Sequence, residues 1–371
     1  MSASEEDSSG ALETVETAGP ADTGSDTAAP EAAAEPRFAE VNPPDGNARA
    51  ATLHLTGADN TVTSAAGPFG LGVLNAAAAW LAGCQGQCPP RVPARIRVVV
   101  FAADHGIAAR GVSARAADTT RELADALASG SGPVATAAEA AGATVRVVDV
   151  GVTGGDGGFA LGHGSEPIDI ADALTEADTL AAVRAGIAVA DAEIDSGTDL
   201  LVAGDLGVGA TTPAAALIAA MTGTEPVAVV GRGSGIDERG WAAKTTAIRD
   251  ALRRAKPHLA DPLALLRTTG GADIAALTGF LAQAAARRTP VVLGGLPVCS
   301  AAMLADELAP GTREWLLAAS TSTEPAHELA LEHLNRAPLL DLRLGGDSGT
   351  ADAGVVATLP LLTTTVRALA G

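Results

Sequence analysis

The chain has 371 residues, of which 47% are hydrophobic, but only 2% are aromatic and Tyr is absent. Its apolar mass is therefore Ala, Val and Leu, which favours a helix-rich protein with closely packed elements. The formal charge is −20, and an acidic surface of this kind excludes the backbone of nucleic acid as the main partner.

Cysteine content and hydropathy restrict the class of protein further. Three cysteines, Cys84, Cys88 and Cys299, are too few for a disulfide framework in a chain of this length. Cys84 and Cys88 have the spacing of half a zinc site, but no second Cys/His pair follows, so we expect no metal. The chain shows no basic and apolar leader and no apolar window of about 18 residues. We therefore expect a cytoplasmic protein without a membrane partner.

The first 40 residues form a separate acidic segment. They hold ten acidic residues and one base, Arg37, so they carry a charge of −9 and leave −11 for the rest of the chain. A segment with so few apolar side chains cannot bury enough surface to offset its chain entropy. We predict a disordered tail over residues 1–40 and a folded region over residues 45–371.

Beyond the tail, two helices are expected, one from about residue 48 and one over 72–82. Short aliphatic runs then alternate with long alanine-rich stretches. The expected strands are Ile96–Phe101, Thr144–Val150, Leu200–Val202, Val227–Val230, Val291–Leu293 and Trp315–Ala318. The expected helices lie near 117–128, 133–141, 173–194, 212–222, 240–255, 272–287 and 298–307.

The strands read as continuous apolar runs, which is typical of a parallel sheet buried on both faces by helices. Alternating strands and helices indicate right-handed crossovers, so we predict an α/β protein with a doubly wound, mainly parallel sheet. Ligands of such sheets bind outside the carboxyl ends of the strands. Polar and glycine residues follow the predicted strands, and they are Asp104, His105, Gly204, Asp205, Gly207, Gly209, Thr211, Thr212, Arg232, Gly233, Ser234 and Gly235.

Gly204–Thr212 is the stretch with the clearest chemistry. Glycines let the backbone approach an anion, and the start of the next helix offers N–H groups and a favourable dipole. Thr211 or Thr212 would cap that helix, with Pro213 in its first turn. We interpret the stretch as a phosphate or ribose cradle, with an ordinary strand-to-helix turn as the alternative. The lysine of a P-loop is missing.

The charged side chains near this edge each have two interpretations. Arg232 would give its glycine loop a fixed cation for a phosphate or carboxylate. Lys244 adds a second cation or is a solvated helix lysine. Asp104 and His105 are an acid/base pair or hydrogen-bonding groups that hold the loop. Glu324 stands at a helix start, where a capping role is the alternative to ligand binding.

Taken in order, these stretches resemble the nicotinate-nucleotide:dimethylbenzimidazole phosphoribosyltransferase family. The resemblance covers residues 45–371. The similar segments are CQGQCPP at 84–90, VVVFAADHGIAARGVSA at 98–114, AGATVRVVDVGV at 141–152, DLLVAGDLGVGATT at 199–212, VAVVGRGSGID at 227–237, TGGADIAALTGFLAQAAARRTPVVL at 269–293 and PLLDL at 338–342.

The resemblance implies transfer of the phosphoribosyl group of nicotinate mononucleotide to 5,6-dimethylbenzimidazole, with release of nicotinate and without a metal or organic cofactor. It implies a homodimer that binds a nucleotide and an azole base. It also implies a Rossmann-like α/β part over about 93–345, with a small helical subdomain built from about 45–92 and C-terminal helices. The catalytic candidates are then Asp205 and Asp347, and the substrate-binding candidates are Asp104, His105, Gly204, Gly207, Gly209, Thr211, Thr212, Arg232, Gly233, Ser234, Gly235, Lys244, Ser322 and Glu324.

The chain departs from the family pattern where the catalytic base is expected. The family's RLGEGTG reads RLGGDSGT at 343–350, so Gly346 or, without a gap from Asp341, Ser348 takes the glutamate position. Asp347 is the nearby carboxylate and is one methylene shorter. Further departures are STSTEPAH for HRSxEPGH at 320–327, Ala210 for the asparagine of GNTT, Gly294–Gly295 for DG, and a KPxGxLG segment without its lysine at 66–72.

Three functions are consistent with these residues. The first is an active transferase in which Asp347 or Asp205 accepts the azole proton, since a positioned base contributes about 10²–10⁴-fold in rate and not all activity. The second is a non-catalytic paralogue that binds nucleotide or azole or pairs with an active subunit. The third is phosphoribosyl transfer to a different acceptor.

Overall fold

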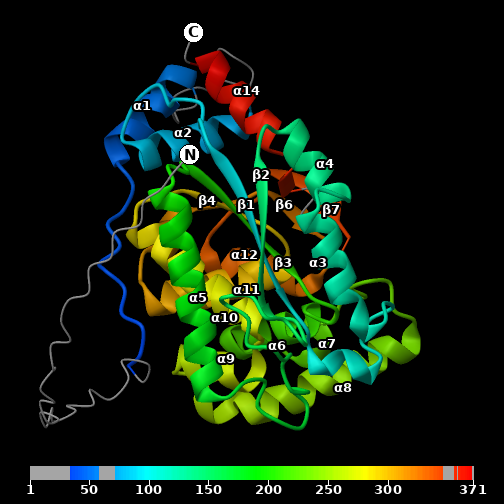
Figure 1. The fold of residues 1–371 in the computed structure, drawn as a ribbon. Helices are drawn as coiled ribbons and strands as arrows, with labels where there is room; N and C mark the ends of the chain where they lie inside the picture. Colours follow the sequence, from blue (N-terminus) through cyan, green and yellow to red (C-terminus); the bar gives the residue numbers. More distant parts are fainter. Residues whose placement is uncertain (1–33, 58–71, 346–354, 357, 370–371) are drawn as a thin grey trace, which may run out of the picture. The chain divides into compact units, whose positions relative to one another are not determined.

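Parallel strands form the central sheet of the computed structural model, which describes residues 34–57, 72–345, 355–356 and 358–369 (Figure 1). Within these residues the sheet has five strands in the order β2-β1-β3-β4-β5. All neighbours pair in parallel, which confirms the predicted fold class. The strands are β1 (Ile96–Ala103), β2 (Thr144–Gly151), β3 (Leu200–Leu206), β4 (Val291–Leu293) and β5 (Leu316–Ala318).

Helices cover both faces of the sheet because its inner strand β1 is apolar on both sides. In β1, Val99 and Phe101 join the core cluster under α5, α10 and α11, while Val98 and Val100 join the cluster under α2, α3 and α4. All four side chains are fully buried. The helices are α1 (Gly46–Thr56), α2 (Leu74–Gln85), α3 (Thr120–Ala128), α4 (Pro133–Ala140), α5 (Glu176–Asp195), α6 (Thr211–Thr222), α7 (Pro226–Val229), α8 (Glu238–Ala255), α9 (Pro262–Thr269), α10 (Ala272–Ala286), α11 (Leu296–Leu308), α12 (Pro325–Leu334) and α14 (Leu359–Leu369).

A second, two-stranded parallel sheet follows β5. It consists of β6 (Ser320–Ser322) and β7 (Leu340–Leu344), with α12 between them in the chain. Neither this pair nor α9 is among the elements predicted from the sequence. A three-residue polar strand such as β6 has no apolar run from which it could be predicted.

The strand predicted over Val227–Val230 is wrong. Pro226 stands at the first helical position, where its fixed φ favours a helix, and the segment forms the single turn α7. Val227 is 59% exposed while Val229 is buried. The run is therefore only half-buried, unlike a strand inside a sheet that helices cover on both faces. The fifth strand of the sheet is β5 instead.

Two distant parts of the chain pack together beside the sheet. Helix α14 contacts α2, and α2 contacts α1 (Figure 1). Leu359, Leu362 and Val366 of α14 share a core cluster with Trp80 and Leu81 of α2. The small helical subdomain inferred from the family resemblance stays a prediction, as do its boundaries. The tail predicted over 1–40 lies mainly outside the described residues. None of the helices in the described part of the chain has the length and apolar content that crossing a bilayer requires.

Helices α5 and α10 touch at their backbones. A Cβ added to Gly186 of α5 would overlap the carbonyl oxygen of Ala276, and one added to Gly279 of α10 would overlap that of Val183. Two glycines therefore set the distance between these helices, since larger side chains cannot fit between facing backbones.

We predict that Gly186→Ala destabilises the protein by about 1–3 kcal/mol or more, because the helices must separate to admit the methyl group. Gly46→Ala is the matched control, since a Cβ at Gly46 meets nothing within 4 Å. Urea unfolding of both variants measures the effect. Equal stabilities for the two variants would contradict the packing described here.

Candidate functional site

The turn from β3 into α6 is packed against the end of β1. Gly204 and Asp205 belong to β3 itself, and Asp205 is 2% exposed. A Cβ at Gly207 would lie 2.5 Å from the carbonyl oxygen of Ala103 and 2.9 Å from the His105 ring. Gly209 has a φ of +90°. These glycines allow one loop to approach another, as the turn interpretation of this stretch requires.

The prediction that Thr211 or Thr212 caps α6 is wrong. Ala210 occupies the N-cap position and makes no side-chain cap. Thr211 Oγ1 instead accepts a hydrogen bond from Lys244 Nζ at 2.9 Å. Thr212 is fully buried, and its hydroxyl makes no hydrogen bond within the described residues. The first turn of α6 is therefore tied to α8 through a threonine and a lysine.

Lys244 and Glu324 form a buried ion pair. Lys244 Nζ lies 3.7 Å from Glu324 Oε2, and the side chains are 0% and 2% exposed. The interpretation of Lys244 as a solvated helix lysine is therefore wrong. Burial lowers the pKa of Lys244, and the Glu324 carboxylate opposes that shift. The pair joins α8 to the start of α12.

The Glu324 carboxylate also binds the glycine loop. Its Oε1 accepts the Gly233 N–H at 2.8 Å. A Cβ at Gly231 would overlap the same carboxylate. Glu324 is at the N-cap position of α12, but its side chain makes no cap bond, so the predicted side-chain capping role is wrong. The structure therefore links the Glu324 carboxylate to Gly233 and Lys244, and through Lys244 to Thr211.

The other polar residues of the loop hold its shape. Arg232 Nη1 donates to the carbonyl of Ile236 at 2.9 Å, and Nη2 pairs with Glu238. Ser234 Oγ accepts the Ala114 N–H at 2.8 Å. Gly235 has a φ of +96°. The Arg232 charge is thus paired with Glu238 at the start of α8, and a role for Arg232 toward a phosphate or carboxylate stays a prediction.

Asp104 and His105 are not an acid/base pair. His105 Nε2 bonds Asp273 Oδ2 at 3.0 Å, with both side chains fully buried. Burial disfavours the protonated ring, but Asp273 outweighs it, so the pKa of His105 is raised. Asp104 Oδ2 accepts the Thr153 N–H at 2.9 Å. Both residues hold loops, which is the alternative considered from the sequence.

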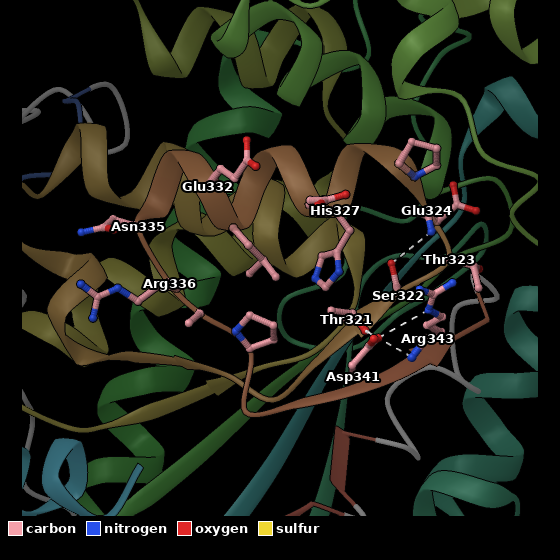
Figure 2. Close-up of a pocket in the computed structure, with 15 residues that line it drawn as sticks. Thr321, Ser322, Thr323, Glu324, His327, Glu332, Asn335, Arg336, Asp341 and Arg343 are labelled. Carbon is pink, nitrogen blue, oxygen red and sulfur yellow. Dashed lines mark hydrogen bonds and ion pairs between the residues drawn. The ribbon is translucent and has the colours of Figure 1, made fainter. Parts of the chain in front are cut away.

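A cavity of about 880 Å³ lies between α12 and the β6–β7 pair (Figure 2). Ser322 and Glu324 are among its walls, and Glu324 N–H donates to Ser322 Oγ at 3.2 Å. At the far side, Thr323 N–H donates to the carbonyl of Leu344 at 3.0 Å. The ends of β6 and β7 therefore meet at the cavity. The lining residues that the sequence did not single out are Thr321, Thr323, Pro325, His327, Glu328, Leu331, Glu332, Asn335, Arg336, Ala337, Pro338, Asp341 and Arg343.

Asp341 and Arg343 belong to the segment that leads to the predicted base. Thr321 Oγ1 donates to Asp341 Oδ1, and Arg343 has a φ of +47° (Figure 2). Asp347 and most of RLGGDSGT lie outside the described residues, as do residues 66–71. Asp347 follows Leu344 by three positions in the sequence. No group of three or more His, Cys, Asp or Glu side chains in the described ranges is arranged to hold a metal ion.

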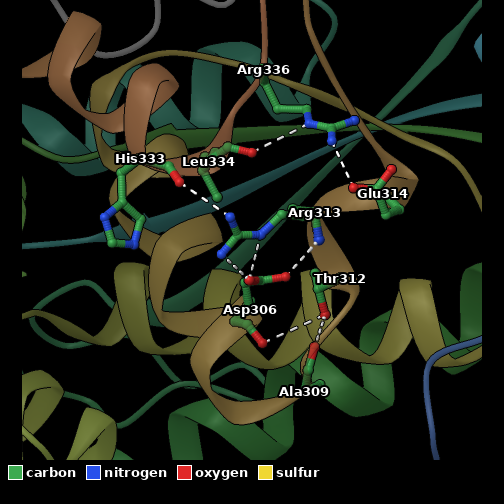
Figure 3. A network of polar contacts seen from close by, with 9 residues as sticks. Asp306, Ala309, Thr312, Arg313, Glu314, His333, Leu334 and Arg336 are labelled. Atoms are coloured by element: carbon green, nitrogen blue, oxygen red, sulfur yellow. Dashed lines mark hydrogen bonds and ion pairs between the residues drawn. The ribbon is translucent and has the colours of Figure 1, made fainter. Parts of the chain in front are cut away.

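A polar network holds the far end of α12 (Figure 3). Arg313 Nε donates to Asp306 Oδ2 at 2.6 Å, and its Nη1 donates to the carbonyl of His333 at 3.2 Å. Arg336, a cavity residue, bonds Glu314 at 2.8 Å. The helix that forms one wall of the cavity is therefore anchored at its last turn as well as at Glu324.

We predict that Lys244→Met destabilises the protein by about 3–5 kcal/mol, because it leaves the Glu324 carboxylate buried without its cation. Adding Glu324→Gln to that variant should restore most of the loss. Lys256→Met, at an exposed position, is the control and should stay within about 0.5 kcal/mol of the unmodified protein. Urea unfolding gives all three values. A Lys244→Met variant as stable as the control would refute the buried pair.

Known proteins with similar sequences share almost the whole folded region. The family model described as phosphoribosyltransferase matches residues 43–371. The nicotinate-nucleotide–dimethylbenzimidazole phosphoribosyltransferase of Mycobacterium ulcerans (strain Agy99) is 49% identical over 90% of this chain and 92% of its own length. The protein of the same name from Mycobacterium avium (strain 104) is also 49% identical, over 90% of this chain and 94% of its own.

A solved structure agrees with these relatives. The crystal structure of CobT from Thermus thermophilus has a TM-score of 0.78 and 37% identity, covering 87% of this chain and 96% of that one. Its similarity extends over the central sheet and the surrounding helices together. The chain therefore belongs to the nicotinate-nucleotide–dimethylbenzimidazole phosphoribosyltransferase family.

Proposed function

We propose that this protein transfers the phosphoribosyl group of nicotinate mononucleotide to 5,6-dimethylbenzimidazole, giving α-ribazole 5′-phosphate and nicotinate. The observation that carries the proposal is the 49% identity with relatives of that name along 90% of the chain. In this reaction the glycosidic bond between ribose and nicotinate breaks, and a bond from the same ribose carbon to an azole nitrogen forms. The azole proton passes to a base.

The geometry of the cavity supports binding of a nucleotide at the ends of β6 and β7. A volume of about 880 Å³ accommodates a mononucleotide and leaves room for a second ring. Ser322 offers a hydroxyl at one wall, and the side chains of Arg336 and Arg343 line others. Because the charge of Lys244 offsets that of Glu324, the carboxylate adds little repulsion toward a phosphate.

The acceptor and the base belong to the same proposal. The segment that begins at Arg343 holds the sole carboxylate between residues 343 and 350, Asp347. We assign Asp347 as the group that accepts the azole proton, with the buried carboxylate of Asp205 as the alternative acceptor. Homodimer formation and a cytoplasmic location are further parts of the proposal, and both rest on the family resemblance. Light scattering of the purified protein tests the dimer.

We predict that purified protein releases nicotinate when incubated with nicotinate mononucleotide and dimethylbenzimidazole. Asp347→Asn should lower the rate by about 10²–10⁴-fold, since it removes the positioned base. Asp125→Asn, at an exposed position of α3, is the control and should keep full activity. Chromatography of nicotinate and of the product measures both.

Two other outcomes would replace the proposal with one of its alternatives. Nucleotide binding by calorimetry without any turnover would indicate a non-catalytic paralogue. Turnover with another azole or a phenol, but not with dimethylbenzimidazole, would indicate a different acceptor.

A further inference from the structure

A buried thiol contacts a histidine at the floor of the cavity. Cys299 of α11 is fully buried, and its Sγ lies 3.3 Å from Nε2 of His327 in the first turn of α12. His327 is 2% exposed and belongs to the cavity lining. Its backbone N–H donates to the carbonyl of Glu324, the residue that pairs with Lys244, at 3.0 Å.

Both partners of this contact are neutral at physiological pH. Burial raises the pKa of Cys299 to about 12, and the charge of Asp205 acts in the same direction. Burial lowers the pKa of His327 to about 4. A neutral imidazole has one N–H donor and one acceptor nitrogen, so the Cys299 contact determines where its single proton resides.

The chemistry of the two groups selects one arrangement. A thiol S–H is a weak donor and its sulfur a weak acceptor, whereas an unprotonated imidazole nitrogen is a good acceptor. An S–H that donates to Nε2, with the ring proton on Nδ1, is therefore the favoured arrangement. Figure 2 shows the His327 ring extending from α12 toward β6.

We propose that Cys299 is a positioning residue that keeps His327 in the Nδ1–H tautomer, so that His327 presents a neutral N–H donor to a phosphate oxygen of the bound nucleotide. The proposal rests on the proposed function, because it takes the nucleotide to bind in this cavity. A tautomer fixed by a second group is a common device for aligning a histidine. Here the second group carries no charge, so the donor is available without protonation.

Nitrogen-15 NMR of the histidine rings tests the tautomer directly, without reference to activity. In the unmodified protein, two-bond correlations should show His327 protonated at Nδ1. In Cys299→Ala the ring should shift toward a mixture with the Nε2–H form, and Cys299→Ser, which keeps an O–H donor, should restore the original pattern. Cys88→Ala, at an exposed cysteine, is the matched control and should leave the spectrum unchanged.

Calorimetry tests the contact with the ligand. The Kd for nicotinate mononucleotide should rise by about 3–10-fold in Cys299→Ala, as expected for one misplaced neutral hydrogen bond, and return in Cys299→Ser. An Nε2–H tautomer in the unmodified protein, or a spectrum of Cys299→Ala identical to it, would overturn the assignment of Cys299. A shifted tautomer with an unchanged Kd would overturn the phosphate contact. An unmodified protein with the Nδ1–H form that binds no nucleotide would instead overturn the proposed function.

Discussion

Glu324 carries a formal charge into the interior of the protein, and the arrangement of the site depends on how that charge is compensated. Removing a carboxylate from water costs several kcal/mol, which only close partners can offset. Those partners are Lys244 and the Gly233 N–H, and Lys244 in turn binds Thr211. Four segments of the chain, namely the start of α6, the glycine loop, α8 and the start of α12, are therefore positioned by one side chain. Movement of α8 or of the start of α12 alone would leave a buried charge unpaired.

The same interaction explains why the cavity has fixed walls. Helix α12 is held at its first turn by the contacts of Glu324 with Lys244 and of His327 with Cys299, and at its last turn by the Arg313 contact with the His333 carbonyl. A site whose walls are held at both ends loses little conformational freedom when a ligand binds. The β6–β7 pair closes the opposite side through the Thr323–Leu344 hydrogen bond. Phosphoribosyl transfer benefits from such rigidity, because the two reacting rings must meet at the ribose carbon in one orientation.

The sequence predicted the strands of the central sheet better than it predicted the contacts of the site residues. Continuous apolar runs such as Ile96–Phe101 predicted buried parallel strands, and β1 covers that run. The run Val227–Val230 is similarly apolar, but the proline before it favours a helical turn, and a four-residue window cannot distinguish a strand from such a turn.

The local sequence pattern also could not reveal contacts between residues that are far apart in the chain. Lys244 meets a glutamate 80 positions later and His105 an aspartate 168 positions later. Their roles as a buried cation and a loop anchor are properties of the tertiary fold.

Some site residues carried no signal in the sequence. Cys299 lies in an alanine-rich helix, and His327 follows a proline at a helix start, so each reads as ordinary packing. Glu324 stood out only as a capping candidate, since helix N-termini favour acidic residues. Its side chain instead pairs with Lys244, because the interaction energy of an ion pair in the interior exceeds the weak attraction of a helix terminus.

A crystal structure of the protein with nicotinate mononucleotide tests the central claim most directly. We expect the nucleotide inside the cavity between α12 and the β6–β7 pair, with its phosphate near Ser322 and the Lys244–Glu324 pair still in place. A nucleotide bound at another surface, or a Glu324 side chain displaced from Lys244 by the phosphate, would contradict it.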